Sequence, residues 1–405
     1  MYYGRKNSNK PAECGERVES DAMALVDMRD MLSHAYEHGY AVAAFEVINV
    51  EVLAAVLSAA ETCRAPVLLM VGNQDAGDGD LEMLMPAIEA AARRSPVPVS
   101  IQCGSVTSLE ALRRAIALGC NGVAMPRKQG AFPAVVKSMR EVVESARDCG
   151  VPVEGGWLSA AEGVLSGNEG PDESVWPTPA EAVALVQRTG LVVFSLDEPG
   201  SATKTRIDFP RLKILNAVLK MPLALYDASS LNEDQIRRVI FKGVAKIRVN
   251  VAINTIAKAV LTRLTANDGV SFWRAFRDEV SADAERNMRL YGSAGRAAEV
   301  LSRCKHWAVV QQVWLCTDEH LSEQAFTSLL SECRELAGNS PGVRGVFAGR
   351  TLTGQDKYRY CVVLRLSHPQ VPMDAQQTQA AMAILRRSFN ERCLAVGVQA
   401  FETVA

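Results

Sequence analysis

The sequence feature that most constrains the fold is the stretch VPVSIQCGSVTSLEALRRAIALGCNGVAMPRK, which holds a complete strand–helix–strand unit. An apolar run rich in β-branched residues at Val97–Gln102 is followed by a helical pattern and then by a second apolar run at Gly122–Met125. Thr107 and Glu110 have the spacing of a capping box that would begin the helix, and Gly119 is placed to end it in a left-handed conformation. Because two strands joined by one helix lie parallel, the stretch predicts a βαβ unit.

The same unit recurs along the first three quarters of the chain. The eight predicted strands are Val42–Phe45, Val67–Val71, Val97–Gln102, Gly122–Met125, Val151–Glu154, Val192–Leu196, Leu223–Tyr226 and Lys246–Val249. Amphipathic helical patterns separate them, and two helices have predicted caps, Thr178 with Glu181 and Asn232 with Gln235. Eight parallel strands over roughly 250 residues are typical of a TIM (β/α)8 barrel. A doubly wound open sheet is the alternative, but it usually has fewer strands and a GxGxxG motif after the first.

Length and composition limit the other possibilities. A chain of 405 residues is too long for one ordinary core, so we expect a flexible tail at 1–20, a barrel at 21–303 and a second domain at 304–405. A net charge of −2 and the lack of a long apolar run argue against nucleic-acid or membrane partners. The 10 cysteines are scattered without paired spacing, which is typical of reduced thiols and predicts a cytoplasmic protein.

The last hundred residues show a different order of elements, strand–helix–strand–strand–helix–strand, which predicts a smaller α+β ferredoxin-like domain. This order resembles the dimeric stress-responsive α/β-barrel (Dabb) domains, which usually pair through their sheets. The resemblance implies an oligomerisation module and a homo-oligomeric protein. The alternative is a second ligand pocket or a cap over a neighbouring barrel.

Polar residues follow the predicted barrel strands, at the end where TIM-barrel enzymes carry their active sites. They include Asn49, Gln102, Lys128, Glu154, Asp197, Glu198, Tyr226, Asp227, Arg248 and Asn250. Any one of them could simply mark the point where a strand reaches water. Polar or charged groups at nearly every strand end favour a cavity for a small-molecule substrate.

Several sequence blocks resemble the class II (zinc-dependent) fructose-bisphosphate aldolases over about 23–298. The blocks GYAVAAFEVINVEVLAAV, ALRRAIALGCNGVAM, QIRRVIFKGVAKIRVN and RLYGSAGRA follow the order and spacing of that family. The resemblance implies a TIM barrel and carbon–carbon lyase chemistry. In the family, a histidine-bound zinc polarises the substrate carbonyl as a Lewis acid.

The positions that would hold this zinc differ here. The family's HLDHG becomes QCGSV, with Gly104 in place of the catalytic Asp and Ser105 in place of a ligand His. Glu154 is kept, Gly156 replaces a second carboxylate, and Glu198 and Tyr226 stand where two further histidines would be. No histidine occurs between residues 39 and 305, so we expect no histidine-bound zinc, and the sequence identifies no other cofactor with certainty.

Other groups could take over the chemistry. The expected catalytic residues are Asp197, Glu198, Asp227, Lys128 and Glu154. Their carboxylates could hold Mg²⁺ or could pair with nearby Arg and Lys, and Lys128 could form a Schiff base or be solvated. Cys103 could be a nucleophile or a small buried residue.

The expected substrate-binding residues are Asn49, Gln102, Tyr226, Ser229, Ser230, Arg248 and Asn250. The loss of both glycines from the family's GGSG motif and the gain of Asp227 oppose a phosphate there, whereas Arg248 could bind a carboxylate or phosphate. The loop between Trp157 and Trp176 could act as a lid, with either tryptophan closing over a ligand or packing on the rim.

Two functions follow from these observations. The first is an aldolase-like enzyme that performs retro-aldol or enolate chemistry on a small oxo-acid, hydroxy-acid or sugar-like substrate without histidine-bound zinc. The second is a barrel that has lost catalysis and binds ligands or acts as a scaffold.

Overall fold

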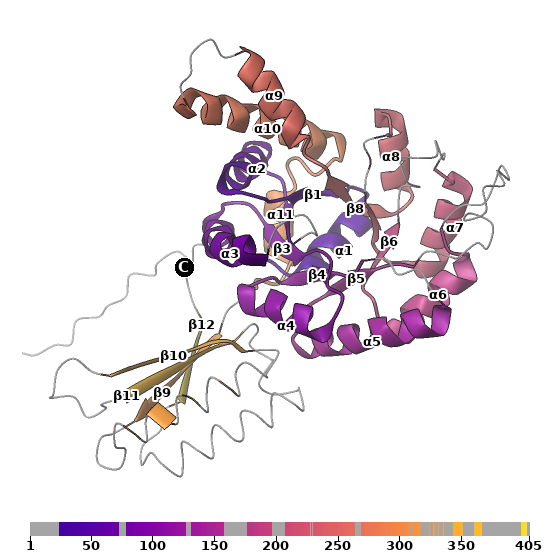
Figure 1. The fold of residues 1–405 in the computed structure, drawn as a ribbon. Coiled ribbons are helices and arrows are strands. Elements are labelled where there is room, and N and C mark those ends of the chain that lie inside the picture. The colour runs from indigo at the N-terminus through magenta and orange to yellow at the C-terminus, as the bar shows by residue number, and fades with distance from the viewer. Residues whose placement is uncertain are drawn as a thin grey trace, which may run out of the picture.

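The eight predicted strands form one closed parallel barrel in the computed structural model, as Figure 1 shows. The strands are β1 (Val42–Glu46), β2 (Val67–Val71), β3 (Val99–Cys103), β4 (Gly122–Ala124), β5 (Val153–Gly155), β6 (Val193–Leu196), β7 (Leu223–Leu225) and β8 (Val244–Val249). Each pairs with the next, and β8 pairs with β1 to close the ring. The predicted TIM barrel is therefore confirmed, and closure rules out the open sheet.

The structure describes residues 24–72, 78–126, 131–157, 176–196, 207–226, 228, 230–263 and 269–307. In the C-terminal region it describes 310–316, 343–350, 360–366 and 398–402, with a few single positions between 324 and 335. No helix among these residues is both long and apolar enough to cross a membrane.

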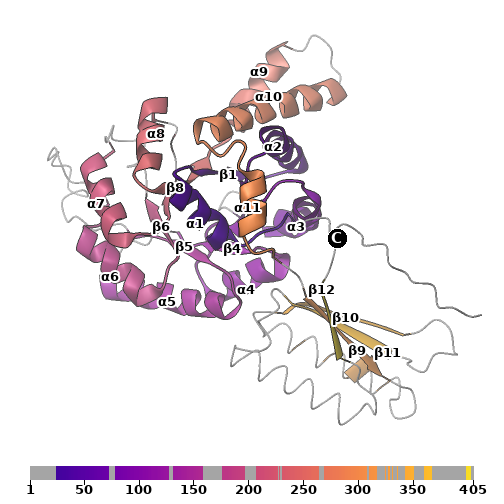
Figure 2. The same ribbon diagram turned by 180° about the vertical axis from the view of Figure 1, so that it is seen from behind.

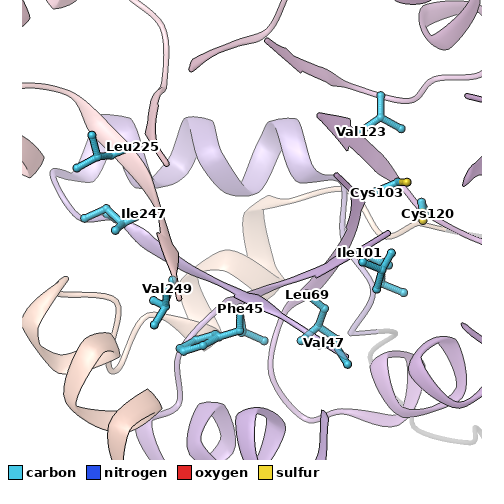
Figure 3. Close-up of a cluster of buried hydrophobic side chains, with 14 of the residues drawn as sticks. Phe45, Val47, Leu69, Ile101, Cys103, Cys120, Val123, Leu225, Ile247 and Val249 are labelled. Atoms are coloured by element: carbon cyan, nitrogen blue, oxygen red, sulfur yellow. The ribbon is translucent and has the colours of Figure 1, made fainter. Parts of the chain in front are cut away.

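Among the described residues, eleven helices surround or cover the barrel. They are α1 (Met28–His38), α2 (Val50–Cys63), α3 (Asp78–Arg94), α4 (Leu109–Leu118), α5 (Phe132–Asp148), α6 (Pro179–Thr189), α7 (Phe209–Leu219), α8 (Glu233–Phe241), α9 (Ile253–Arg263), α10 (Gly269–Leu290) and α11 (Ala297–Arg303) within the described residues. In the main core cluster, outward-facing strand residues such as Phe45, Leu69 and Ile247 pack with the surrounding helices (Figure 3). Alternate residues therefore point into the barrel.

Helix α1 closes one mouth of the barrel, and Figure 2 shows it lying across the centre. Its Met28, Met31 and Leu32 pack with strand residues such as Val42 at the start of β1, which identifies this mouth as the N-terminal one. A Cβ atom at Gly122 would lie 2.4 Å from the Met28 sulfur, so glycine there leaves room for the helix. The opposite mouth, at the C-terminal strand ends, is where a site is expected.

Helix caps explain where several elements begin. Thr178 with Glu181 and Asn232 with Gln235 form capping boxes, as the sequence predicts. The prediction for α4 is wrong by one residue: Ser108, not Thr107, is the cap, and its Oγ accepts a hydrogen bond of 3.1 Å from the Ala111 N–H. Gly119 ends α4 with a φ of 106°, as predicted.

The C-terminal region contains an antiparallel four-stranded sheet in the order β10-β11-β9-β12. Its strands are β9 (Val310–Cys316), β10 (Val343–Arg350), β11 (Tyr360–Leu366) and β12 (Val398–Glu402). Most of the two helices predicted here falls outside the described residues, so the ferredoxin-like domain and its resemblance to Dabb domains stay predictions. The domain boundaries also stay predictions; Trp307, beyond the expected end of the barrel, is buried in the barrel's core.

Candidate functional site

Four polar side chains, from β3, β5, β6 and β8, meet inside the barrel. The Lys246 ammonium of β8 donates to Glu154 Oε2 of β5 at 2.5 Å and to Gln102 Oε1 of β3 at 2.6 Å. Gln102 Nε2 donates to the same Glu154 oxygen at 2.8 Å, and Ser195 Oγ of β6 donates to Glu154 Oε1 at 2.9 Å. Four strands are thereby joined across the barrel interior.

This network is an ion pair removed from water, because Lys246 and Glu154 each expose only 1% of their side-chain surface. Burial opposes ionisation of Glu154, but the Lys246 charge and the hydrogen bonds from Lys246, Gln102 and Ser195 outweigh it and lower the pKa of Glu154. Burial lowers the pKa of Lys246, and Glu154 opposes that change. Both oxygens of the carboxylate have donors, which a buried charge requires.

A second ion pair lies one layer higher, nearer the C-terminal mouth. Arg248 follows Lys246 on the same face of β8, and its Nη2 donates to Glu46 Oε2 of β1 at 2.7 Å. The guanidinium carbon lies 4.5 Å from the centre of the Tyr226 ring, just after β7. The arginine is therefore held by a carboxylate and an aromatic face, and two predicted substrate-binding residues, Arg248 and Tyr226, are in contact.

The other predicted site residues are placed as follows. Asn250 lines a cavity next to the end of β8. Asn49 caps α2, accepting a hydrogen bond of 2.9 Å from the Val52 N–H through its side-chain oxygen. Ser230 lies in an exposed turn. Lys128, Asp197, Glu198, Asp227 and Ser229 lie outside the described residues, so their roles stay predictions.

Sequence reasoning missed Lys246 and Ser195. The sequence pattern predicts Lys246 only as part of an apolar strand, although it lies two residues before Arg248 and must therefore share its face. A lysine at an inward position of an otherwise apolar strand is the signal that could have found it, since a buried lysine needs a partner. Ser195 carried no comparable signal, because a serine within a strand is common on either face.

Cys103 and the two tryptophans pack in the core. Cys103 is buried in the main apolar cluster, and Figure 3 shows it beside Cys120; a hydrogen bond from Cys120 lowers the pKa of its thiol. Trp157 and Trp176 are also buried, and Trp157 packs edge-to-face on Phe132 with ring centres 5.0 Å apart. The loop that they flank, 158–175, lies outside the described residues.

The three described histidines lie away from the C-terminal mouth. His34 and His38 stack on α1 at the N-terminal mouth, with ring centres 4.0 Å apart. The backbone of His306 forms an isolated antiparallel β-bridge with Val26. The Val26 N–H donates to the carbonyl of Val99 at the start of β3. No group of three or more His, Cys, Asp or Glu side chains in the described parts of the chain is arranged to hold a metal ion.

Comparison with known proteins agrees with this fold. Residues 26–296 match the model of the family described as class-II fructose-bisphosphate aldolase. Fructose-bisphosphate aldolase from Geobacillus stearothermophilus is 30% identical over 294 residues, which cover 68% of this chain and 100% of that protein. YdjI from Escherichia coli K12 is 27% identical over 282 residues, covering 67% of this chain and 99% of YdjI.

Solved structures show the same relation. The crystal structure of the YdjI aldolase superimposes with a TM-score of 0.59 and 25% identity, covering 67% of this chain and 99% of that one. A putative fructose-1,6-bisphosphate aldolase from Coccidioides immitis, 21% identical with a TM-score of 0.58, covers 67% of this chain and 98% of its own and shares the fold. From residue 26 to residue 296 the match is continuous, and the chain belongs to the class II fructose-bisphosphate aldolase family.

Proposed function

We propose that this family member is a carbon–carbon lyase of the aldolase type that works without a histidine-bound zinc. Its substrate class is a small oxo-acid, hydroxy-acid or sugar-like molecule. The observation that carries the proposal is the distribution of histidines: none occurs between residues 39 and 305, and the three described histidines are associated with the N-terminal end of the barrel.

The residues present do not fit the zinc that the family implies. The one family carboxylate that is kept, Glu154, is already neutralised by Lys246 and accepts hydrogen bonds on both oxygens. A second carboxylate cannot be accommodated at Gly156 without movement, because a Cβ atom there would lie 2.4 Å from the backbone oxygen of Ser195. Glu154 and Gly156 are therefore not suited to hold the family's zinc.

Retro-aldol cleavage requires a base that removes the substrate hydroxyl proton and a positive group that stabilises the enolate. Asp197, Glu198 or Asp227, at the ends of β6 and β7, would be the base. Arg248 or Lys128 would stabilise the negative charge, and Lys128 would be the amine of a Schiff-base mechanism. Mg²⁺ bound by the carboxylates is the remaining route for charge stabilisation.

The second candidate is a barrel without catalytic activity that binds ligands or acts as a scaffold. It is favoured by the replacement of the family's catalytic Asp by Gly104 and of its ligand histidine by Ser105, which has a φ of 62°. A homo-oligomeric state stays a prediction under both proposals.

The test is a retro-aldol assay on the full-length chain after treatment with a chelator, with zinc measured in the same sample. The fructose-bisphosphate aldolase of Geobacillus stearothermophilus, treated identically, is the control. We expect aldehyde release with only traces of zinc, and a kcat about 100-fold lower in the variant that lacks the base, tested as Asp197→Asn, Glu198→Gln and Asp227→Asn. Stoichiometric zinc whose removal abolishes turnover would refute the mechanism. Ligand binding without turnover of any aldol would favour the second candidate.

A further inference from the structure

A cavity of about 390 Å³ opens beside the C-terminal end of β8. Its wall includes Arg248 and Asn250 from this end of β8, Ile236 of α8, and Asp283 and Asn287 of α10. This volume is at the small end of the range for ligand sites in proteins. Apolar and hydrogen-bonding groups are both present, as recognition of a small polar metabolite requires.

Arg248 is held in one orientation in the wall of this cavity. Glu46 accepts from Nη2, the Tyr226 ring packs against the guanidinium plane, and only 17% of the arginine side chain is exposed. Its Nε is buried without a hydrogen-bond partner among the described residues. A guanidinium fixed in this way loses little side-chain entropy when it binds an anion.

The charges around the cavity favour an anion with a single negative charge. Two arginines in the wall, Arg248 and Arg286, are matched by Glu279 and Asp283. Each of these charges has an ion-pair partner: Arg286 pairs with Asp283, Glu279 with Arg263, and Arg248 with Glu46. The charges of the wall already balance, so a phosphate dianion would bring two negative charges without positive partners. A carboxylate brings one negative charge, which the guanidinium of Arg248 can bind.

We propose that Arg248 binds the carboxylate of a small carboxylic acid in this cavity, and that Glu46 and Tyr226 are positioning residues for Arg248. The inference rests on the proposed function, since it makes the substrate an oxo- or hydroxy-acid and not a sugar phosphate. Asn250 and Asn287 supply further hydrogen bonds for the rest of the molecule.

The experiment measures binding by isothermal titration calorimetry with the full-length protein. Pyruvate is the carboxylate probe, methyl pyruvate has the same carbonyl without the charge, and inorganic phosphate is the competing anion. We expect pyruvate to bind measurably tighter than methyl pyruvate or phosphate. Arg248→Met should weaken pyruvate binding by about 10- to 100-fold, as loss of a charged hydrogen bond predicts.

Two further variants separate recognition from folding. Arg248→Met leaves Glu46 without its partner, so Glu46→Gln/Arg248→Met removes both charges and should show the same loss of pyruvate affinity. Arg289→Met is the matched control: this arginine pairs with Glu285 on α10, does not line the cavity, and should leave pyruvate binding unchanged. Glu46→Gln alone should weaken binding less than Arg248→Met, and Arg248→Lys should restore part of it.

Equal binding of pyruvate and methyl pyruvate, tighter binding of phosphate, or unchanged affinity in Arg248→Met would overturn the inference. Because the measurement does not depend on turnover, these outcomes differ from failure of the lyase proposal. Retro-aldol activity on an uncharged substrate that is independent of Arg248 would leave the lyase proposal standing and contradict this one.

Discussion

At the scale of single residues, Lys246 and Glu154 form a buried ion pair inside the barrel. Each lies on a different strand, and each is almost completely removed from water. Burial of one charge without the other is strongly unfavourable, whereas an apolar pair of similar size can be tolerated. The pair is therefore expected to behave as a unit when it is mutated.

Lys246→Met should lower the free energy of unfolding by ~3–5 kcal/mol, because Glu154 would be left as an unpaired buried carboxylate. Glu154→Gln should also lower the free energy of unfolding, because it leaves the Lys246 charge unpaired and its single amide oxygen cannot accept from both Lys246 and Ser195, which donate to different oxygens of Glu154. The double variant Lys246→Met/Glu154→Gln should recover much of the stability lost in Lys246→Met. Urea denaturation followed by circular dichroism measures all three. Strictly additive losses would show that the two charges are independent.

Gly156 gives a second prediction for a single residue. A Cβ atom there would lie 2.4 Å from the Ser195 backbone oxygen, so Gly156→Glu, which restores the family's carboxylate, should cost about 2 kcal/mol or more. Gly269→Ala is the matched control, since nothing lies within 4 Å of the added atom. The comparison is again made by urea denaturation. A stable Gly156→Glu protein would mean that β6 moves easily.

At the scale of elements, short-range chemistry decides where each helix begins. Ser108→Ala should cost about 1 kcal/mol, because its Oγ accepts the Ala111 N–H at the start of α4. Thr107→Ala removes a neighbouring hydroxyl that does not cap the helix and should cost much less. Thermal unfolding of the two variants checks the difference. A larger loss of stability for Thr107→Ala would show that Thr107, the residue that the sequence pattern favours, caps the helix.

The same scale shows what could be predicted from the sequence. All eight barrel strands were predicted within two residues at each end, because apolar runs and helix signals alternate regularly. The missed cap arose because threonine and serine are both good caps and sequence spacing alone does not show which of the two adjacent residues precedes the first helical one; Ser108 does, with an extended backbone and a side chain that accepts from the Ala111 N–H. The Lys246 network was missed because it joins strands that are far apart in sequence, and strand pattern alone does not show which polar residues meet across a barrel. Five of the predicted site residues lie outside the described residues and remain untested.

At the scale of the whole molecule, one ion pair joins the C-terminal sheet to the outside of the barrel. Arg344 of β10 donates to both oxygens of Glu89 on α3, at 2.8 and 2.6 Å, and Glu89 also accepts from Arg93. Burial opposes the charge on Glu89, but hydrogen bonds and charges from the two arginines outweigh it and lower its pKa from 4.5 to about 2. This contact therefore couples attachment of the sheet to pH.

The sign of that dependence follows from linkage. A carboxyl whose pKa is lower in the folded protein contributes stability above its ordinary pKa, and this contribution is lost as the pH falls through the folded value. For Glu89 the window runs from about 4.5 down to about 2. The difference in unfolding free energy between the wild-type protein and Glu89→Gln should therefore be at most ~3 kcal/mol at neutral pH and should shrink across that window. Urea denaturation at a series of pH values measures this difference.

Glu82→Gln is the matched control, because Glu82 lies on the same helix in an exposed pair with Arg114 at 3.3 Å, and exposed pairs contribute little. If the Glu89→Gln difference stays constant from neutral pH to the acid end of the window, the ion pair does not hold the sheet against the barrel. If it shrinks as predicted while the Glu82→Gln difference stays small, the ionised Glu89 carboxylate, which binds Arg344 and Arg93, contributes to stability as its lowered pKa predicts.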